Sequence, residues 1–352
     1  MIRFAGPGST LVAQLGSATC AIAKGPGGAV FREASRILVD FRKVRKGRRS
    51  TAAGEGVLLA VGNQALTPPP QSSQAQLIAP IAGGAVRDSS GALLLLQGLI
   101  RRHHLESVRS RLAGRDILLL VPPGADNDER RIWQRLGETT GRGRVRLVNS
   151  LEAAARGAGL DLNRTRGVMI VDMGAESTAL GVYSIGEKVA LEVEPYGGSH
   201  LNRAIIDYLL RRYRISLSPA EAEKIKLELG SVYPQERPAQ FRLTGSDTSS
   251  GIVKKISLDD NEIRDVLVDA CEPLLLSIQR VFEQVPPELA ADVSEDGVTL
   301  VGGGALLKGL RPFLKERTGM EFHPADDPAN AAVRGALALL HDPEDPRQEE
   351  DK

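Results

Sequence analysis

Residues 168–179 read VMIVDMGAESTA, an apolar run that ends in an acidic residue, a glycine and several small residues. A similar segment lies near the start of the chain, where residues 12–21 read VAQLGSATCA. Each segment places a polar residue, Asp172 or Gln14, two positions before a glycine. The pattern predicts a β-hairpin whose tight turn exposes backbone N–H groups, which bind phosphate. An ordinary glycine hairpin is the alternative for either segment alone, but the matching pair favours two phosphate-binding loops in two facing halves of the chain.

The residues expected to surround phosphate are those of the two turns. In the first turn they are Gly16, Ser17, Ala18 and Thr19. In the second turn they are Gly174, Ala175, Glu176 and Ser177.

Two further features complete the candidate site. Gly302, Gly303 and Gly304 follow an apolar strand and precede a helix, and such a turn lets a flat base or ribose approach the backbone. Glu223 and Lys226 lie three residues apart on a predicted helix and therefore share one face. A solvated surface pair is the other explanation for that spacing.

Apolar strands alternate with helical patterns along the chain, which predicts an α/β fold with partly parallel sheets. Among the expected elements are one strand over 29–40, a helix that Ser89 or Ser90 caps and that runs to residue 112, and one long helix over 259–283. Residues 218–221 (SPAE) carry a cap, a proline and a capping-box glutamate, so they predict a helix start.

The composition is that of an ordinary globular protein of 352 residues with a net charge of +1, and the length suits two domains. Only two cysteines occur, Cys20 and Cys271, which excludes a disulfide scaffold and fits a reducing cytoplasm. No apolar run has the roughly 18–20 residues of a membrane span, and residues 1–9 do not resemble a secretory signal. The acidic tail 341–352 is expected to be disordered.

Residues 41–49 read FRKVRKGRR and concentrate positive charge in one predicted loop. A solvated connector is one interpretation. The other is contact with an anionic surface such as the inner membrane leaflet, where each nearby Lys or Arg contributes about 1 kcal/mol. The near-zero net charge gives no global attraction to nucleic acid, so no nucleic-acid partner is expected. The basic residues of the loop are Arg42, Lys43, Arg45, Lys46, Arg48 and Arg49.

The order of hairpin, hairpin, charged helix and triple glycine resembles the actin, sugar-kinase and heat-shock ATPase superfamily. Residues 223–234 (EKIKLELGSVYP), 286–290 (PPELA) and 302–307 (GGGALL) resemble the MreB/Mbl family of bacterial actin-like proteins. The similarity is dense from about residue 145 to the last predicted helix and looser before it. It implies an actin-like fold in which each half is a mixed sheet flanked by helices, with ATP and Mg²⁺ in the cleft between the halves. It also implies self-assembly into filaments that help organise cell shape or cell-wall synthesis.

The resemblance also implies domain boundaries. Domain I is expected over 1–165 with a small subdomain at about 36–80, and domain II over 166–325 with a small subdomain at about 212–258. The final helix, within 326–340, is expected to pack back on domain I.

By the same resemblance, Asp172 and Gly174 belong to the second phosphate loop, where the aspartate helps hold the metal ion and its waters. Glu223 and Lys226 are the expected adenosine contacts, and the triple glycine is the expected base-binding turn.

Three positions depart from the family pattern. Gln14 stands where the first loop has an aspartate, Glu176 where the second has a glycine, and Asn149 with Ser150 where paired glutamates are expected, one of which positions the attacking water. A carboxylate at about 5 Å repels a phosphate charge by about 3 kcal/mol at an effective dielectric of 20. Glu176 therefore either weakens nucleotide binding or compensates for Gln14 by binding Mg²⁺.

These departures leave more than one function open. The favoured one is a filament protein that binds ATP and hydrolyses it weakly or not at all. The alternatives are a pseudo-actin that caps or copolymerises with a second MreB-type protein, and a kinase on the same fold. The expected location is cytoplasmic, with peripheral contact at the inner face of the cell membrane through the basic loop.

Overall fold

The computed structural model describes residues 10–41, 56–67, 74–106, 114–237 and 239–340. The chain divides into two compact units: unit 1 is formed by residues 1–160 and 330–352, and unit 2 by residues 161–329. Among the described residues, no helix has the length and apolar character needed to cross a bilayer.

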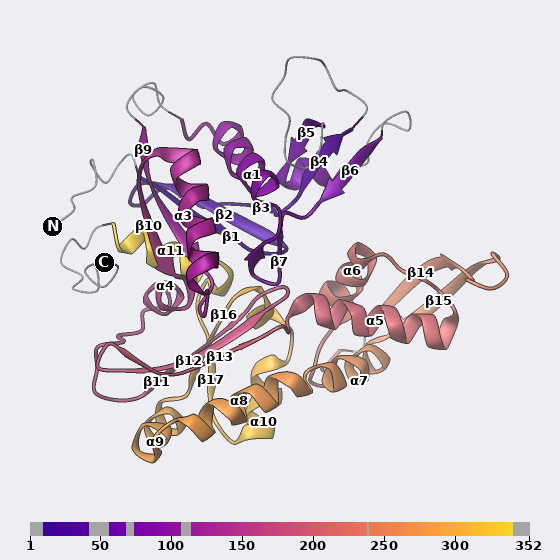
Figure 1. Ribbon diagram of the computed structural model, residues 1–352. Coiled ribbons are helices and arrows are strands. Elements are labelled where there is room, and N and C mark those ends of the chain that lie inside the picture. The colour runs from indigo at the N-terminus through magenta and orange to yellow at the C-terminus, as the bar shows by residue number, and fades with distance from the viewer. Residues whose placement is uncertain (1–9, 42–55, 68–73, 107–113, 238, 341–352) are drawn as a thin grey trace. The chain divides into compact units, whose positions relative to one another are not determined.

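The centre of unit 1 is a five-stranded mixed sheet in the order β10-β9-β1-β2-β3 (Figure 1). Strand β1 pairs antiparallel with β2 and parallel with β9, so the first hairpin lies in the middle of the sheet. The strands are β1 (Leu11–Leu15), β2 (Thr19–Lys24), β3 (Phe31–Ala34), β9 (Arg115–Val121) and β10 (Arg142–Asn149).

Helices cover both faces of this sheet. As a result, every described side chain of β9 is buried, whichever face it points to. Ile117 and Leu119 join Leu95 and Trp133 in one apolar cluster, and the buried Leu118 between them faces the other side of the sheet. The helices of unit 1 are α1 (Ser89–Arg102), α3 (Asn127–Gly141), α4 (Ser150–Gly157) and α11 (Ala331–Ala338).

Two glycines explain why the last helix packs closely on α4. A Cβ atom on Gly157 would lie 1.9 Å from the carbonyl oxygen of Ala331, and one on Gly335 would lie 1.8 Å from that of Ala153. Only residues without side chains let the two backbones approach this closely. The chain therefore returns to unit 1 after it has completed unit 2.

A smaller sheet of unit 1 has the order β5-β4-β6, and a short hairpin, β7–β8, follows it. The elements are β4 (Ile37–Asp40), β5 (Val57–Val61), η2 (Gly62–Leu66), β6 (Ala75–Ile78), β7 (Ile81–Ala82) and β8 (Ala85–Val86).

Unit 2 is built around a second five-stranded mixed sheet, in the order β13-β12-β11-β16-β17. Its strands are β11 (Val168–Met173), β12 (Thr178–Ser184), β13 (Glu187–Glu194), β16 (Val298–Val301) and β17 (Phe322–Pro324). A separate hairpin of β14 (Gln240–Ser246) and β15 (Val253–Asp259) extends from the helices of the unit (Figure 1).

The helices of unit 2 surround one apolar core that includes residues of β11, β12 and β16. They are α5 (Gly198–Tyr213), α6 (Pro219–Leu229), α7 (Asp260–Ala270), α8 (Glu272–Gln284), α9 (Pro287–Asp296) and α10 (Leu310–Thr318), with short turns η3 (Gly303–Leu306) and η4 (Pro328–Asn330). The predicted start of α6 is confirmed, since Ser218 and Glu221 form a reciprocal capping box.

Three predicted elements were wrong in extent. The strand expected over 29–40 is two strands, since Ser35 N donates to Ala18 O and the chain then passes into the small sheet. Helix α1 is capped by Asp88, whose carboxylate accepts from two backbone amides, and it ends at Arg102. The helix expected over 259–283 is split into α7 and α8, because Pro273 lacks the N–H that a continuous helix needs.

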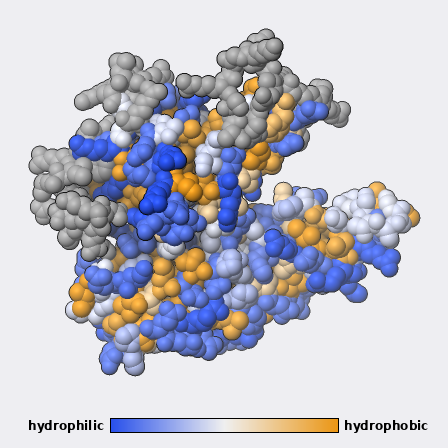
Figure 2. All heavy atoms as spheres, in the orientation of Figure 1, coloured by the Kyte–Doolittle hydropathy of each residue, from blue (hydrophilic) through white to orange (hydrophobic). Residues whose placement is uncertain are grey.

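Apolar and hydrophilic residues are interspersed on the face of the molecule drawn in Figure 2. Among the described residues, several large apolar side chains are more than half exposed. They include Leu66, Leu227, Ile252, Val253, Leu276 and Leu306.

Candidate functional site

The two predicted turns have the same backbone geometry. Gly16 N donates to Thr19 O at 3.0 Å, and Gly174 N donates to Ser177 O at 2.9 Å. A Cβ atom on either glycine would lie 2.8 Å from that same oxygen, so each turn closes on a residue without a side chain. The backbone amides of the two-residue turns, at 17–18 and 175–176, lie outside the ladder of paired strand residues. The predicted duplication is therefore present in the structure, one copy in each unit.

The register of the strands extends this correspondence. Gln14 pairs with Ala21 in the first hairpin, and Asp172 pairs with Ala179 in the second. Gln14 and Asp172 are therefore equivalent positions, each at the end of a central strand. The first unit presents an amide where the second presents a carboxyl group.

The first turn is held from two sides. The hydroxyl of Ser17 accepts a hydrogen bond from Gly84 N at 3.1 Å, which ties the turn to the β7–β8 hairpin. Arg36 Nη1 donates to the carbonyl oxygen of Ser17 at 2.8 Å. Arg32 Nη2 donates to Thr19 Oγ1 at 2.9 Å. Two guanidinium groups thus contact a turn predicted to hold phosphate, and the sequence interpretation missed both.

The start of helix α5 holds the second turn. Gly198 N donates to Gly174 O at 3.1 Å, and Ser199 N donates to Ala175 O at 2.7 Å. A Cβ atom on Gly197 would lie 2.5 Å from Gly174 O, so a glycine is required there for the helix to approach the turn. The carbonyl oxygens of the turn are thereby paired with a helix N-terminus.

The triple glycine packs against the end of β11. Gly302 has a φ of +81°, and a Cβ atom there would lie 2.3 Å from Asp172 Oδ1. A Cβ atom on Gly304 would lie 2.6 Å from the Cβ of Met173. Around Gly303 nothing lies within 4 Å of such an atom, so this glycine borders open space. The structure therefore brings Asp172 and the triple glycine together.

Asp172 as a residue is partly exposed to solvent, but its carboxyl group is surrounded by protein. This burial raises the pKa of Asp172 from 3.8 to about 6. The protonated, neutral form of the carboxyl group is favoured because the charged form loses contact with water. A cation that reached this carboxylate would reverse the effect.

Glu223 and Lys226 share one face of α6, as their spacing predicted. Lys226 Nζ donates to Glu223 Oε2 at 2.8 Å and to the carbonyl oxygen of Gly198 at 3.1 Å. Asn202 Nδ2 donates to the same Glu223 oxygen at 2.7 Å. Because Gly198 also contacts the second turn, the pair is connected to that turn through α5. Asn202, a buried residue that the sequence interpretation missed, belongs to this cluster.

Asn149 ends β10 and caps helix α4. Its Oδ1 accepts hydrogen bonds from Leu151 N at 2.9 Å and Glu152 N at 3.4 Å. The next residue, Ser150, is buried. The amide oxygen of Asn149 is therefore engaged in a local structural role.

The carboxylates do not form a metal site by themselves. Among the described residues, no group of three or more His, Cys, Asp or Glu side chains is arranged to hold a metal ion. Mg²⁺ is usually bound by one or two carboxylates, with phosphate and water oxygens completing its octahedron. A site with only Asp172 and Glu176 would therefore need further oxygens from a ligand and from water. The six basic residues of 42–49 lie outside the described residues.

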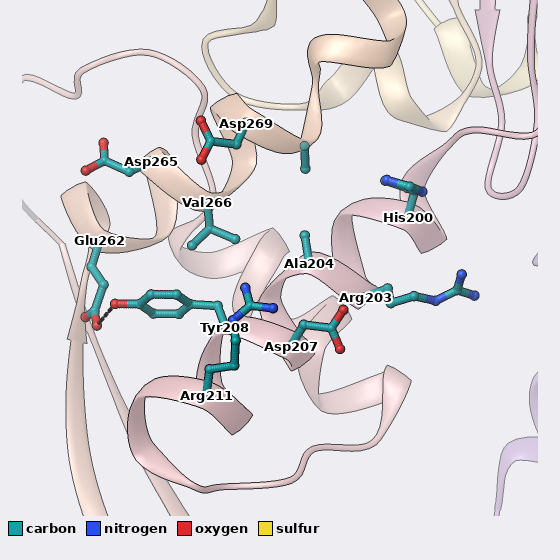
Figure 3. A pocket seen from close by; sticks show the side chains of 11 residues that line it. His200, Arg203, Ala204, Asp207, Tyr208, Arg211, Glu262, Asp265, Val266 and Asp269 are labelled. Carbon is teal, nitrogen blue, oxygen red and sulfur yellow. Dashed lines mark hydrogen bonds between the residues drawn. The ribbon is translucent and has the colours of Figure 1, made fainter.

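A separate hollow of about 550 Å³ lies between α5 and α7 (Figure 3). Its lining includes Asp207, Tyr208 and Glu262, and none of the residues predicted to bind nucleotide. The hydroxyl of Tyr208 donates to Glu262, as does that of Tyr213 at 2.6 Å. Burial, and then this carboxylate, raises the pKa of Tyr208. The cluster therefore joins α5 to α7.

The sequence profile described as "MreB/Mbl protein" matches residues 9–348. The chain belongs to the MreB/Mbl family. The cell shape-determining protein MreB of Escherichia coli (strain K12) is 35% identical to this family member over 263 residues, which cover 75% of each chain.

Two solved structures share the fold of this MreB/Mbl protein. MreB5 of Spiroplasma citri, bound to AMPPNP, matches with a TM-score of 0.84 at 24% identity, covering 94% of this chain and 95% of that one. The MamK double helical filament matches with a TM-score of 0.73 at 18% identity, covering 94% and 99%. The predicted actin-like fold, with mixed sheets flanked by helices, is thus confirmed.

Proposed function

We propose that this MreB/Mbl protein binds ATP and polymerises into filaments that help organise cell shape or cell-wall synthesis. The observation that carries the proposal is the duplicated turn, with one closing bond of 3.0 Å in unit 1 and one of 2.9 Å in unit 2. Similarity to the Spiroplasma citri MreB5 bound to AMPPNP supports the proposed binding of a nucleotide. Similarity to the MamK double helical filament supports the proposed assembly.

We assign the parts of the nucleotide to residues as follows. The backbone amides of the two turns bind the phosphates, since such amides form anion-binding concavities. Glu223 and Lys226 contact the adenosine. The open space beside Gly303 accepts the base or ribose, because no side chain occupies it.

Asp172, with Glu176, is the proposed contact of a Mg²⁺ ion that the nucleotide carries. The two accounts of Glu176 predict opposite effects of one variant. Glu176→Gly weakens Mg·ATP binding if the carboxylate is a ligand, and it tightens binding if the carboxylate only repels the phosphates. Calorimetric titration of both proteins with Mg²⁺ and with EDTA distinguishes them.

Hydrolysis is proposed to be weak or absent. Asn149 has an amide that cannot accept a proton from water at neutral pH, and its oxygen caps α4. Losing a group that activates water commonly costs on the order of a hundred- to ten-thousand-fold in rate.

Sedimentation and electron microscopy at micromolar protein, with ATP, with ADP and without nucleotide, test the assembly. Filaments or sheets in the pellet are expected. A protein that stays monomeric under all nucleotide and salt conditions contradicts it. Pelleting only together with a second MreB-type protein identifies the alternative, a capping or copolymerising module.

A further inference from the structure

Arg32 lies on β3, opposite Ala21 of β2, and its side chain reaches the tip of the first hairpin. One guanidinium nitrogen, Nη2, donates to Thr19 Oγ1 at 2.9 Å. The other, Nη1, donates to Asn330 Oδ1 at 3.3 Å, immediately before helix α11. Two segments of unit 1 therefore hold this cation beside the first turn.

The chemistry of the contact suits an anion. A guanidinium is always charged, and its planar donors match the geometry of phosphate oxygens. The Thr19 hydroxyl accepts from Arg32, so its own hydrogen is directed elsewhere and can be donated. Arg32 and Thr19 therefore add hydrogen-bond donors beside a turn whose amides are proposed to bind phosphate.

Arg36 has a different role at the same turn. Its Nη1 donates to two backbone carbonyl oxygens, those of Ser17 and Ser35, each at 2.8 Å. Such bonds fix the path of the backbone, so Arg36 is a positioning residue. It therefore provides a matched control, a second guanidinium on the same turn that has another function.

We propose that Arg32 binds the phosphate chain of the nucleotide directly, as a cation of the first loop. The inference rests on the proposed nucleotide binding and extends it to a residue outside the turn. The first loop carries the neutral Gln14 where the second carries Asp172, so the equivalent strand end of unit 1 adds no negative charge of its own. We expect the contribution of Arg32 to persist when divalent cations are removed.

The test is calorimetric titration of ATP, ADP and adenosine into wild type, Arg32→Met, Arg32→Lys and Arg36→Met, in Mg²⁺ and in EDTA. Arg32→Met is expected to weaken ATP and ADP binding by about 10- to 100-fold in both buffers, and to leave adenosine binding unchanged. Arg32→Lys is expected to fall between, because it keeps the charge and loses the planar fork. Thermal unfolding of each variant monitors the fold.

Three results would overturn the inference while leaving the proposed function in place. Wild-type ATP affinity in Arg32→Met would exclude the contact while leaving nucleotide binding intact. Equal ATP affinities of Arg32→Lys and Arg32→Met would show that no positive charge at this position contacts the phosphates. Equal loss of adenosine and ATP in Arg32→Met would indicate a structural role. Failure of the wild type to bind any of the three ligands would overturn the proposed function as well. This outcome is distinguishable from the others, which concern Arg32 alone.

Discussion

Gly302 lies directly against the carboxyl group of Asp172, so closely that a Cβ atom would be 2.3 Å from Oδ1. Its φ of +81° belongs to the left-handed region, which residues with a side chain rarely adopt. The position of the acid at the end of β11 therefore depends on the absence of a side chain at the residue that follows the neighbouring strand, β16.

Gly302→Ala is expected to lower the free energy of unfolding by about 2–4 kcal/mol, from the strained φ and the contact with Asp172. Gly303→Ala is the control, because its Cβ meets nothing within 4 Å and should change stability by less than about 0.5 kcal/mol. Denaturant unfolding checks both values. Gly303→Ala should still weaken nucleotide binding, and unchanged affinity would contradict the proposed use of that space.

Asp172 is expected to make stability depend on pH. Its pKa is raised from 3.8 to about 6 in the folded protein, so between these values the folded state binds more protons than the unfolded state. The contribution of Asp172 to the free energy of unfolding therefore falls as pH rises from about 4 to 6, by up to about 3 kcal/mol. Below pH 4 both states are protonated, and above pH 6 the loss is complete.

Asp172→Asn removes this cost, so in EDTA it should be more stable than wild type at pH 7.5 by about 1–3 kcal/mol and should lack the contribution of Asp172 to the pH dependence between 4 and 6. Urea unfolding at pH 4.5, 6 and 7.5 measures both effects. Asp265→Asn, on the largely exposed surface of α7, is the control and should behave like wild type. Identical pH profiles for Asp172→Asn and wild type would contradict the assigned pKa.

Local signals in the sequence predicted much of this arrangement. The two glycine turns and the Ser218 capping box depend on residues within a few positions of one another, and the structure contains them. Pro273 was a local signal as well, and its effect on the helix over 259–283 was underestimated.

Contacts between distant segments could not be predicted in the same way. Arg32 meets Asn330 across 298 positions, and Asn202 meets Glu223 across 21. Nothing in strand or helix periodicity specifies which polar side chain of another element will reach a turn. The break between β3 and β4 has the same origin. The chain passes there from one sheet to another, and no glycine or proline marks the change in the sequence.

Lys226 and Lys224 of α6 provide a matched pair for testing the adenosine assignment. The side chain of Lys226 is 10% exposed and contacts Glu223 and Gly198, whereas that of Lys224 is 65% exposed. Lys226→Met should reduce stability by about 1–2 kcal/mol and weaken adenosine binding. Lys224→Met should cost less than about 1 kcal/mol and leave binding unchanged. Calorimetry and urea unfolding of both variants measure this, and equal adenosine affinities would contradict the assignment.

The basic loop at 42–49, which lies outside the described residues, is expected to bind anionic liposomes. Replacing Arg45, Lys46, Arg48 and Arg49 by glutamine should abolish co-sedimentation, whereas replacing the three arginines by lysine should preserve it. Binding should weaken steeply with salt, because exposed charges are screened over about 8–10 Å at physiological ionic strength. Salt-insensitive binding, or equal binding to zwitterionic liposomes, would show that charge is not the cause.

Asn149 allows structure and catalysis to be separated at one position. Asn149→Ala removes the cap from α4 and should lower the free energy of unfolding by about 1 kcal/mol. Asn149→Asp should keep full stability, because aspartate caps helices as well as asparagine does and favours their N-termini. The new carboxylate would accept bonds from Leu151 N and Glu152 N, which lower its pKa and make it a poor base. Phosphate release should therefore stay slow in wild type and in both variants. An increase of about tenfold or more in Asn149→Asp alone would show that this side chain reaches the attacking water, and that its capping role does not prevent catalysis.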